Sequence, residues 1–246
     1  MFNSTNTFVI SHPTKKEERK RIFDDQCLQK GISVSYYDPV DATLFKDINN
    51  IKIPLNTMLT EEQIILYKEH VFKYTPHTNP RVNNRTSTTN YIATTLSHFF
   101  LYKKLLEDDA NDMYLIFEDD FRLTKNFDID YFNLCVSELP PDFDVCLFSP
   151  LHAHRVLHPI SNPISNNLYR IKEDFNLYSG VSMYLVSKSY AKKVLSRYGF
   201  NYVYVSDDHL SNFSLEGNLK AYATFKIFGF GNVDAFPNAV EQFDLV

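Results

Sequence analysis

The 246-residue sequence has few glycines, few cysteines and no excess of positive charge, and each shortage excludes a class of protein. Its six glycines form no glycine-rich phosphate loop of the P-loop type. The three cysteines, Cys27, Cys135 and Cys146, are odd in number, far apart and set among apolar residues, which argues against a disulfide framework or a thiolate metal site. We expect buried free thiols, as in a reducing compartment.

Long apolar runs are also missing. No stretch approaches the roughly 20 residues that a membrane-spanning helix needs, and the first residues lack the basic-then-apolar order of a signal peptide. The sequence therefore predicts a cytoplasmic protein without a transmembrane segment. The formal net charge of −5 argues against nucleic acid as a partner, because binding to phosphate backbones requires clustered Lys and Arg.

Strand and helix patterns alternate along the chain, and 44 % of the residues are hydrophobic, which is enough for a substantial core. No linker is evident, so we expect one α/β domain over residues 1–246. Residues 44–90 carry the weakest pattern, with a helix near 61–74 and a polar loop over 75–90. A loop of that length suggests an insertion or a lid.

The clearer patterns describe a mixed sheet flanked by helices. Gly31 ends the first helix, Thr89 or Asn90 caps the second, and Ser187 caps the third. The predicted strands are residues 7–10, 32–37, 113–117, 143–148, 168–171 and 181–186, and the predicted helices are residues 15–30, 91–109 and 187–197.

The tripeptide Glu-Asp-Asp occurs twice, and the two copies have different surroundings. The first copy, residues 107–109, closes a predicted helix, and nothing apolar follows it until Met113. Acids at the carboxyl end of a helix oppose its dipole. We therefore interpret the first copy as a solvated helix end without chemistry.

The second copy, Glu118-Asp119-Asp120, directly follows the apolar run 113–117, which is typical of a strand buried on both faces. Ligands of open α/β sheets bind outside the carboxyl ends of the strands. If the strand continued, Glu118 and Asp120 would share one side and Asp119 would lie on the other. Repulsion between three adjacent carboxylates either raises the pKa of one of them or favours the binding of a cation. Mg²⁺ and Mn²⁺ prefer oxygen ligands such as carboxylates. A solvated acid cluster is the alternative.

A further acid pair, Asp207-Asp208, occurs in "YVYVSDDHLSNF" beside His209. By itself this pair also fits the first turn of a helix that Ser206 caps, because acids are favourable at a helix N-terminus.

Several blocks, taken in order, resemble glycosyltransferase family 25, which includes bacterial lipooligosaccharide galactosyltransferases and collagen galactosyltransferases. The blocks are "FVISHPTKKEERKRIF", "SVSYYDPVDA", "LSHFFLYKKLLED", "YLIFEDDFRL", "SGVSMYLVSKSYAKKVL", "VSDDHL" and "FPNAVEQ". The resemblance implies a GT-A fold, a Rossmann-like sheet that binds a nucleotide-sugar, usually with Mn²⁺, and transfers the sugar with inversion. The family's usual Asn-Leu-Asp after the first strand is replaced here by Ile10-Ser11-His12, which leaves the donor's base contacts open.

The resemblance also implies roles for single residues. Asp120 would bind the metal, Glu118 would reach the metal or the ribose, and Asp119 would orient the site or contact the sugar. Asp207 would be the base that deprotonates the acceptor hydroxyl, with Asp208 as its substitute.

Further residues in the matched blocks are candidate donor contacts, and they are Ser11, His12, Arg19, Asp41, His98 and Gly180. His12 and Arg19 belong to the first strand-turn-helix unit, where a helix start favours a diphosphate. Arg19 is alternatively a solvated helix charge. His98 would contact phosphate or acceptor, or would be a helix histidine that a nearby carbonyl satisfies.

The function expected from this resemblance is transfer of galactose or glucose from a UDP-sugar to a hydroxyl group. The acceptor would be a lipooligosaccharide, another oligosaccharide or a protein with hydroxylysine. Two alternatives stay open, a metal-dependent phosphohydrolase and a binding protein for nucleotide-sugars that has lost turnover.

Overall fold

The computed structural model describes residues 2–11, 16–38, 40, 85–149, 162–171, 182–197 and 219–231. An eight-stranded sheet in the order β2-β1-β3-β8-β5-β9-β7-β6 runs through it. Its strands are β1 (Thr7–Ile10), β2 (Ser35–Tyr37), β3 (Met113–Glu118), β5 (Val145–Leu147), β6 (Asn162–Pro163), β7 (Leu168–Arg170), β8 (Met183–Ser187) and β9 (Ala221–Thr224). A two-stranded sheet pairs β4 (Arg122–Leu123) with β10 (Gly229–Phe230).

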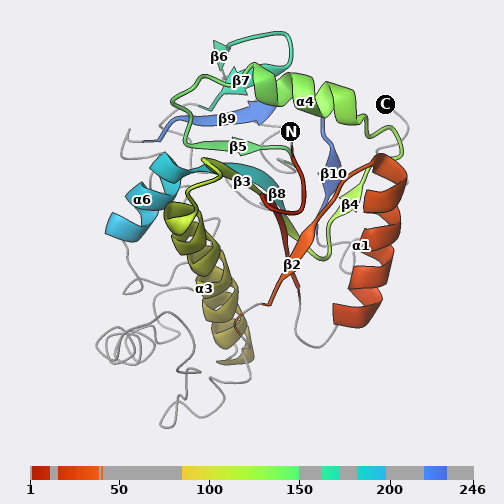
Figure 1. The fold of residues 1–246 in the computed structure, drawn as a ribbon, viewed down its shortest axis with the longest axis vertical. Coiled ribbons are helices and arrows are strands. Elements are labelled where there is room, and N and C mark those ends of the chain that lie inside the picture. Colours follow the sequence, from red (N-terminus) through yellow and green to blue (C-terminus); the bar gives the residue numbers. More distant parts are fainter. Residues whose placement is uncertain are drawn as a thin grey trace.

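Helices cover both faces of the large sheet. Figure 1 shows α3 (Arg85–Glu107) and α6 (Lys188–Arg197) on one side, and α1 (Lys16–Lys30) and α4 (Ile129–Ser137) on the other. Strand β3 pairs in parallel with β1 and antiparallel with β8, so the sheet is mixed. This arrangement confirms the predicted α/β class with a mixed sheet between helices.

Strand β3 explains how the two cores are divided. Tyr114 and Ile116 pack into the core beneath α3 and α6, whereas Leu115 and Phe117 pack into the core beneath α1 and α4. All four side chains are buried, which confirms the prediction of a strand covered on both faces. Because side chains alternate along a strand, the residues that follow Phe117 are also aimed at alternate faces for as long as the strand continues.

Helix α1 ends as its sequence predicts. Gly31 has a φ of 68°, a conformation that glycine adopts at little cost. The amide of Gly31 donates to the carbonyl of Leu28 at 3.3 Å, and the amide of Ile32 donates to the carbonyl of Cys27 at 2.9 Å. This pair of bonds is a Schellman motif, which satisfies carbonyls at the helix end and turns the chain toward β2.

Helix α3 is longer than predicted. It begins at Arg85, so the residues proposed as its caps, Thr89 and Asn90, lie inside the helix, and the predicted loop over 75–90 is wrong for its last six residues. The helix penalty of Ser, Thr and Asn is only several tenths of a kcal/mol per residue, and a long helix packed on a sheet overrides it. The helix predicted near 61–74 lies outside the described residues.

The three cysteines are buried and unbonded, as predicted. Burial raises the pKa of Cys27 to about 12 and that of Cys135 to about 11, and it also raises the pKa of Cys146. All three therefore stay protonated at neutral pH and offer no thiolate to a metal or a substrate. Within the described ranges, no helix is long and apolar enough to cross a membrane.

Candidate functional site

The second Glu-Asp-Asp lies at the carboxyl edge of two neighbouring parallel strands. Glu118 is the last residue of β3 and pairs with Ile10, the last residue of β1. The amide of Asp119 donates to the carbonyl of Ile10 at 3.2 Å. Ser11, which is 2 % exposed, follows Ile10 at the same edge. The fold thus places Ser11, a predicted donor contact, beside the three acids at the end of β3.

The strand ends at Glu118 and does not continue through the acids. The amide of Phe121 donates to the carbonyl of Glu118 at 3.1 Å, which closes a turn around Asp119 and Asp120. The condition under which strand alternation would place Asp120 on the side of Glu118 is therefore not met. The turn, and not strand alternation, decides where the Asp120 side chain lies.

Glu118 is aimed at the α3 side of the sheet, in step with Ile116. The hydroxyl of Ser182 donates to Oε2 of Glu118 at 2.9 Å. His98 Nε2 of α3 lies 3.7 Å from Glu118 Oε1. The Glu118 side chain is 30 % exposed whereas that of His98 is 1 % exposed, so the carboxylate lies between a buried imidazole and the surface.

His98 has a hydrogen-bonding partner at one of its two ring nitrogens. Its Nδ1 lies 2.5 Å from the hydroxyl oxygen of Tyr184, which in turn lies 3.0 Å from that of Tyr102. The nearby carbonyl suggested for His98 is thus replaced by a tyrosine hydroxyl, because β8 places Tyr184 directly under α3. Direct contact between His98 and the donor or the acceptor stays a prediction.

Asp119 is aimed at the opposite face and is buried, with 3 % of the residue exposed. Its Oδ1 accepts a hydrogen bond from Nη1 of Arg19 on α1 at 2.7 Å. Nη1 of Arg122 donates to the carbonyls of Asp119, at 3.2 Å, and Phe121, at 2.8 Å. The alternative that Arg19 is a solvated helix charge is wrong, because the guanidinium is drawn inward by the carboxylate of Asp119.

Gly231 and Ser182 complete this neighbourhood, and neither was predicted from the sequence. A Cβ added to Gly231, just after β10, would lie 1.8 Å from the Oγ of Ser182 and 3.9 Å from Oδ1 of Asp120. Only glycine therefore lets β10 approach Ser182 and the acids this closely. The Gly-Phe-Gly of residues 229–231 was the available signal, because glycine within a strand often marks a close backbone approach.

The carboxylates of Glu118 and Asp120 are suitable ligands for Mn²⁺ or Mg²⁺. In the parts of the chain that the structure describes, no group of three His, Cys, Asp or Glu side chains could hold a metal. Two carboxylates still fit, since such ions commonly bind one or two carboxylates together with substrate phosphates and water. The remaining predicted residues, His12, Asp41, Gly180, Asp207 and Asp208, lie outside the described residues.

The first Glu-Asp-Asp has a structural task that the sequence interpretation did not foresee. Asp108 accepts hydrogen bonds from the hydroxyl of Tyr114 at 2.7 Å and from the side-chain amide of Asn111 at 2.8 Å. These two bonds lower the pKa of Asp108 to about 2. Asp109, in contrast, is exposed. The copy is therefore only partly a solvated helix end, because Asp108 ties the end of α3 to β3.

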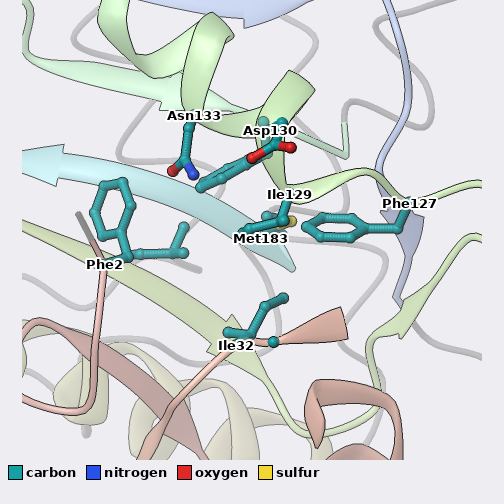
Figure 2. Close-up of a pocket in the computed structure, with 10 residues that line it drawn as sticks. Phe2, Ile32, Phe127, Ile129, Asp130, Asn133 and Met183 are labelled. Carbon is teal, nitrogen blue, oxygen red and sulfur yellow. The ribbon is translucent and has the colours of Figure 1, made fainter. Parts of the chain in front are cut away.

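A separate apolar pocket lies on the α1 and α4 side of the sheet. It has a volume of about 240 Å³, and Figure 2 shows Asp130 and Asn133 of α4 above a mainly apolar lining. The lining residues are Phe2, Gly31, Ile32, Leu115, Phe127, Ile129, Asp130, Phe132, Asn133 and Met183. None of the second Glu-Asp-Asp residues lines it, so this pocket is distinct from the acid cluster.

The sequence of blocks around this acid cluster can be compared with known families. The family described as Glycosyltransferase family 25 (LPS biosynthesis protein) matches residues 4–210, which is most of the chain. The chain belongs to glycosyltransferase family 25. The match includes the acids after β3 and also Asp207 and Asp208. It confirms the family resemblance seen in the sequence.

Solved structures give weaker similarities. The apo crystal structure of mouse xyloside xylosyltransferase 1 has a TM-score of 0.34 and 9 % identity over 87 % of this chain and 83 % of that chain. A glycosyltransferase involved in glycosylation of the major capsid of PBCV-1 has a TM-score of 0.32 and 10 % identity over 98 % of both chains. No curated protein gives a significant match. Membership of family 25 therefore rests on the sequence match.

Proposed function

We propose that this family 25 member transfers galactose or glucose from a UDP-sugar to a hydroxyl group, with inversion at the transferred carbon. The observation that carries the proposal is the Glu-Asp-Asp at the exit of β3, with Glu118 held by Ser182 and Asp119 held by Arg19. Open α/β sheets bind ligands at this edge. We also propose that the sheet is of the GT-A type.

Each acid has a distinct task in this proposal. Glu118, partly exposed, receives the metal or the ribose of the donor. Asp120 is the proposed metal ligand, on the turn that follows the strand. When bound, Mn²⁺ or Mg²⁺ supplies positive charge that offsets the charge developing on the departing diphosphate. Asp119 is held in the interior by Arg19, which supports the orienting role for Asp119 over direct contact with the sugar.

The donor contacts and the base are proposed from the family blocks. Ser11 directly follows β1 at the edge where the acids lie, and this position supports a contact with the donor. His12, Asp41 and Gly180 are proposed as further donor contacts. Asp207 is the proposed base that takes the proton of the acceptor hydroxyl, and Asp208 is its substitute. Arg19 would contact the diphosphate while it keeps its hydrogen bond to Asp119.

The acceptor is proposed as a glycan of the lipooligosaccharide kind, in keeping with the LPS biosynthesis description of the family. Another oligosaccharide and a hydroxylysine-bearing protein are the other acceptors to test. We place the reaction in the cytoplasm, and the three buried free thiols support a reducing compartment.

The test is thermal denaturation with UDP-galactose, UDP-glucose, GDP-sugars and CMP-sugars, each with and without Mn²⁺. A ligand at ~100 times its Kd stabilises the folded state by about 2.7 kcal/mol, which raises the melting temperature. We expect the UDP-sugars to give the largest rise and to be turned over. Stabilisation by CMP-sugars alone would overturn the donor assignment.

Turnover assays separate the alternatives. Hydrolysis of a phosphomonoester without use of any nucleotide-sugar would indicate the phosphohydrolase. Binding of the donor with neither sugar transfer nor slow hydrolysis of the donor would indicate the inactive binding protein. Asp207→Asn should abolish transfer and keep donor stabilisation, because a base acts on the acceptor. Loss of donor stabilisation in Asp207→Asn would place Asp207 in the donor site instead.

A further inference from the structure

A buried row of side chains lies behind Glu118. His98 Nδ1 is 2.5 Å from the hydroxyl oxygen of Tyr184, and that oxygen is 3.0 Å from the hydroxyl oxygen of Tyr102. All three residues are at most 4 % exposed. At the other end of the row, His98 Nε2 faces Glu118 Oε1 at 3.7 Å and makes no hydrogen bond to any described residue.

The neighbours of the two ring nitrogens differ in what they can offer. An ionised carboxylate only accepts, so the nitrogen that faces Glu118 is favourable when it carries a hydrogen. A tyrosine hydroxyl both donates and accepts, so Tyr184 can donate to Nδ1. The opposite tautomer would direct the Nε2 lone pair at a carboxylate, and two acceptors repel each other strongly in a buried place. Of the two neutral tautomers, the contacts therefore favour the one with its proton on Nε2.

We propose that His98 is a positioning residue for Glu118, and that Tyr184 and Tyr102 hold its ring in the tautomer with the proton on Nε2. This inference rests on the proposed role of Glu118 in donor binding. Ser182 holds Oε2 with a hydrogen bond and His98 borders Oε1 at 3.7 Å, so the carboxylate has a neighbour at each oxygen while its side chain stays partly exposed for the donor.

The 3.7 Å separation is longer than a hydrogen bond, and a small movement of the Glu118 side chain would shorten it to one. Catalytic hydrogen bonds are often long in unliganded proteins and shorten in the complex. A partner that orients a ligand-binding side chain typically contributes about 10- to 100-fold to affinity or activity. His98 acts through Glu118, so the loss of His98 is expected to weaken binding of the donor.

The first test reads the tautomer directly. ¹⁵N NMR of histidine-labelled wild-type protein distinguishes a protonated from an unprotonated ring nitrogen, and the spectrum of His98→Gln identifies the His98 signals. We expect hydrogen on Nε2 and none on Nδ1, and we expect Tyr184→Phe to disturb this pattern. Hydrogen on Nδ1 in the wild type would overturn the proposal. This measurement needs no sugar transfer.

The second test compares two replacements of His98 by calorimetric titration with UDP in the presence of Mn²⁺. Glutamine can place an amide hydrogen near the position of Nε2, whereas leucine only fills space. We expect about threefold weaker binding for His98→Gln and about 10- to 100-fold weaker binding for His98→Leu. Equal losses in the two variants would show that His98 serves packing alone and would overturn the proposal.

Two isosteric variants keep the test independent of folding defects. Tyr184→Phe keeps the ring and removes the hydroxyl that controls Nδ1, so it should weaken UDP binding by about tenfold, and Tyr102→Phe, one step further away, should weaken it less. An equal or reversed order would contradict the proposal. Failure of the wild type to bind any nucleotide-sugar would overturn the proposed function, whereas hydrogen on Nδ1 in a protein that binds UDP would overturn only the role of His98.

Discussion

Nη1 of Arg19 lies 2.7 Å from Oδ1 of Asp119, although the two residues are 100 positions apart in the chain. The pair joins α1 to the turn after β3, and both side chains are largely buried. Removing one partner of a buried pair leaves the other charge in the interior without its counter-ion, which costs far more than the loss of a surface pair.

Arg19→Met should therefore destabilise the protein by about 3 kcal/mol in urea unfolding. Arg21→Met is the matched control, because Arg21 is an exposed residue of the same helix and its loss should change the unfolding free energy by about 0.5 kcal/mol or less. The double variant Arg19→Met with Asp119→Leu should recover part of the loss. Similar stabilities for the two single variants would mean that the Arg19–Asp119 pair does not hold the turn.

The two copies of Glu-Asp-Asp allow a comparison between equal changes of charge. Asp120→Asn should reduce Mn²⁺-dependent transfer by about 10²-fold or more, the scale of losing one preorganised electrostatic group. Asp109→Asn, at an exposed position of the first copy, should leave transfer unchanged. Side-by-side turnover and melting assays check both, and equal activities would place the catalytic centre elsewhere.

Gly231 should be sensitive to a single methyl group. In Gly231→Ala the new Cβ would fall 1.8 Å from the Oγ of Ser182, so Ser182 or β10 has to move, and with it the hydrogen bond to Glu118. We expect about tenfold or greater loss of UDP affinity, the usual effect of disturbing a side chain that orients a ligand-binding group. Calorimetric titration measures it.

Gly31→Ala is the control for this effect. Gly31 has a positive φ of 68°, and a Cβ there meets nothing within 4 Å. The change should cost about 1 kcal/mol of stability through backbone strain and leave UDP affinity as in the wild type. Wild-type affinity in Gly231→Ala as well would show that Ser182 does not position Glu118.

Asp108 should make stability depend on pH in acid. The hydroxyl of Tyr114 and then the amide of Asn111 lower the pKa of Asp108 to about 2 in the folded protein, against about 4 for an unfolded chain. A lowered pKa gives stability that is fully present above about pH 4 and is lost as the pH falls toward 2.

The measurement is the difference in unfolding free energy between wild type and Tyr114→Phe, which lacks the donating hydroxyl. We expect this difference to be constant from pH 7 to pH 5 and to shrink between about pH 4 and pH 2. A difference that is unchanged at pH 3 would mean that the Asp108 carboxylate gains nothing from Tyr114.

Local patterns predicted the elements whose causes are local. The apolar run 113–117 predicted β3 because five consecutive large apolar residues are typical of a strand that is covered on both faces, and Gly31 predicted the end of α1 because of its backbone freedom. The start of α3 was missed because Ser, Thr and Asn are nearly indifferent between helix and loop, so packing decides.

The acid cluster was found from sequence because a strand exit is a local feature, but its contacts were not. The bond from Arg19 to Asp119 depends on how α1 packs on the sheet, and the place of Ser182 beside Glu118 depends on the pairing of β3 with β8. The side of Asp120 could not be predicted, because no local pattern marks where the strand gives way to a turn. Such relationships are properties of tertiary structure, which a single sequence does not display.

The bond between Asp108 and Tyr114 links the two copies of Glu-Asp-Asp in a further way. A strand that slips by one residue exchanges its two faces, because the side-chain period is two. Such a slip of β3 would turn Glu118 from His98 toward α1. The hydrogen bond from Tyr114, four residues before Glu118, opposes such a slip. The first acid cluster therefore helps to keep the Glu118 side chain on the α3 face of the sheet.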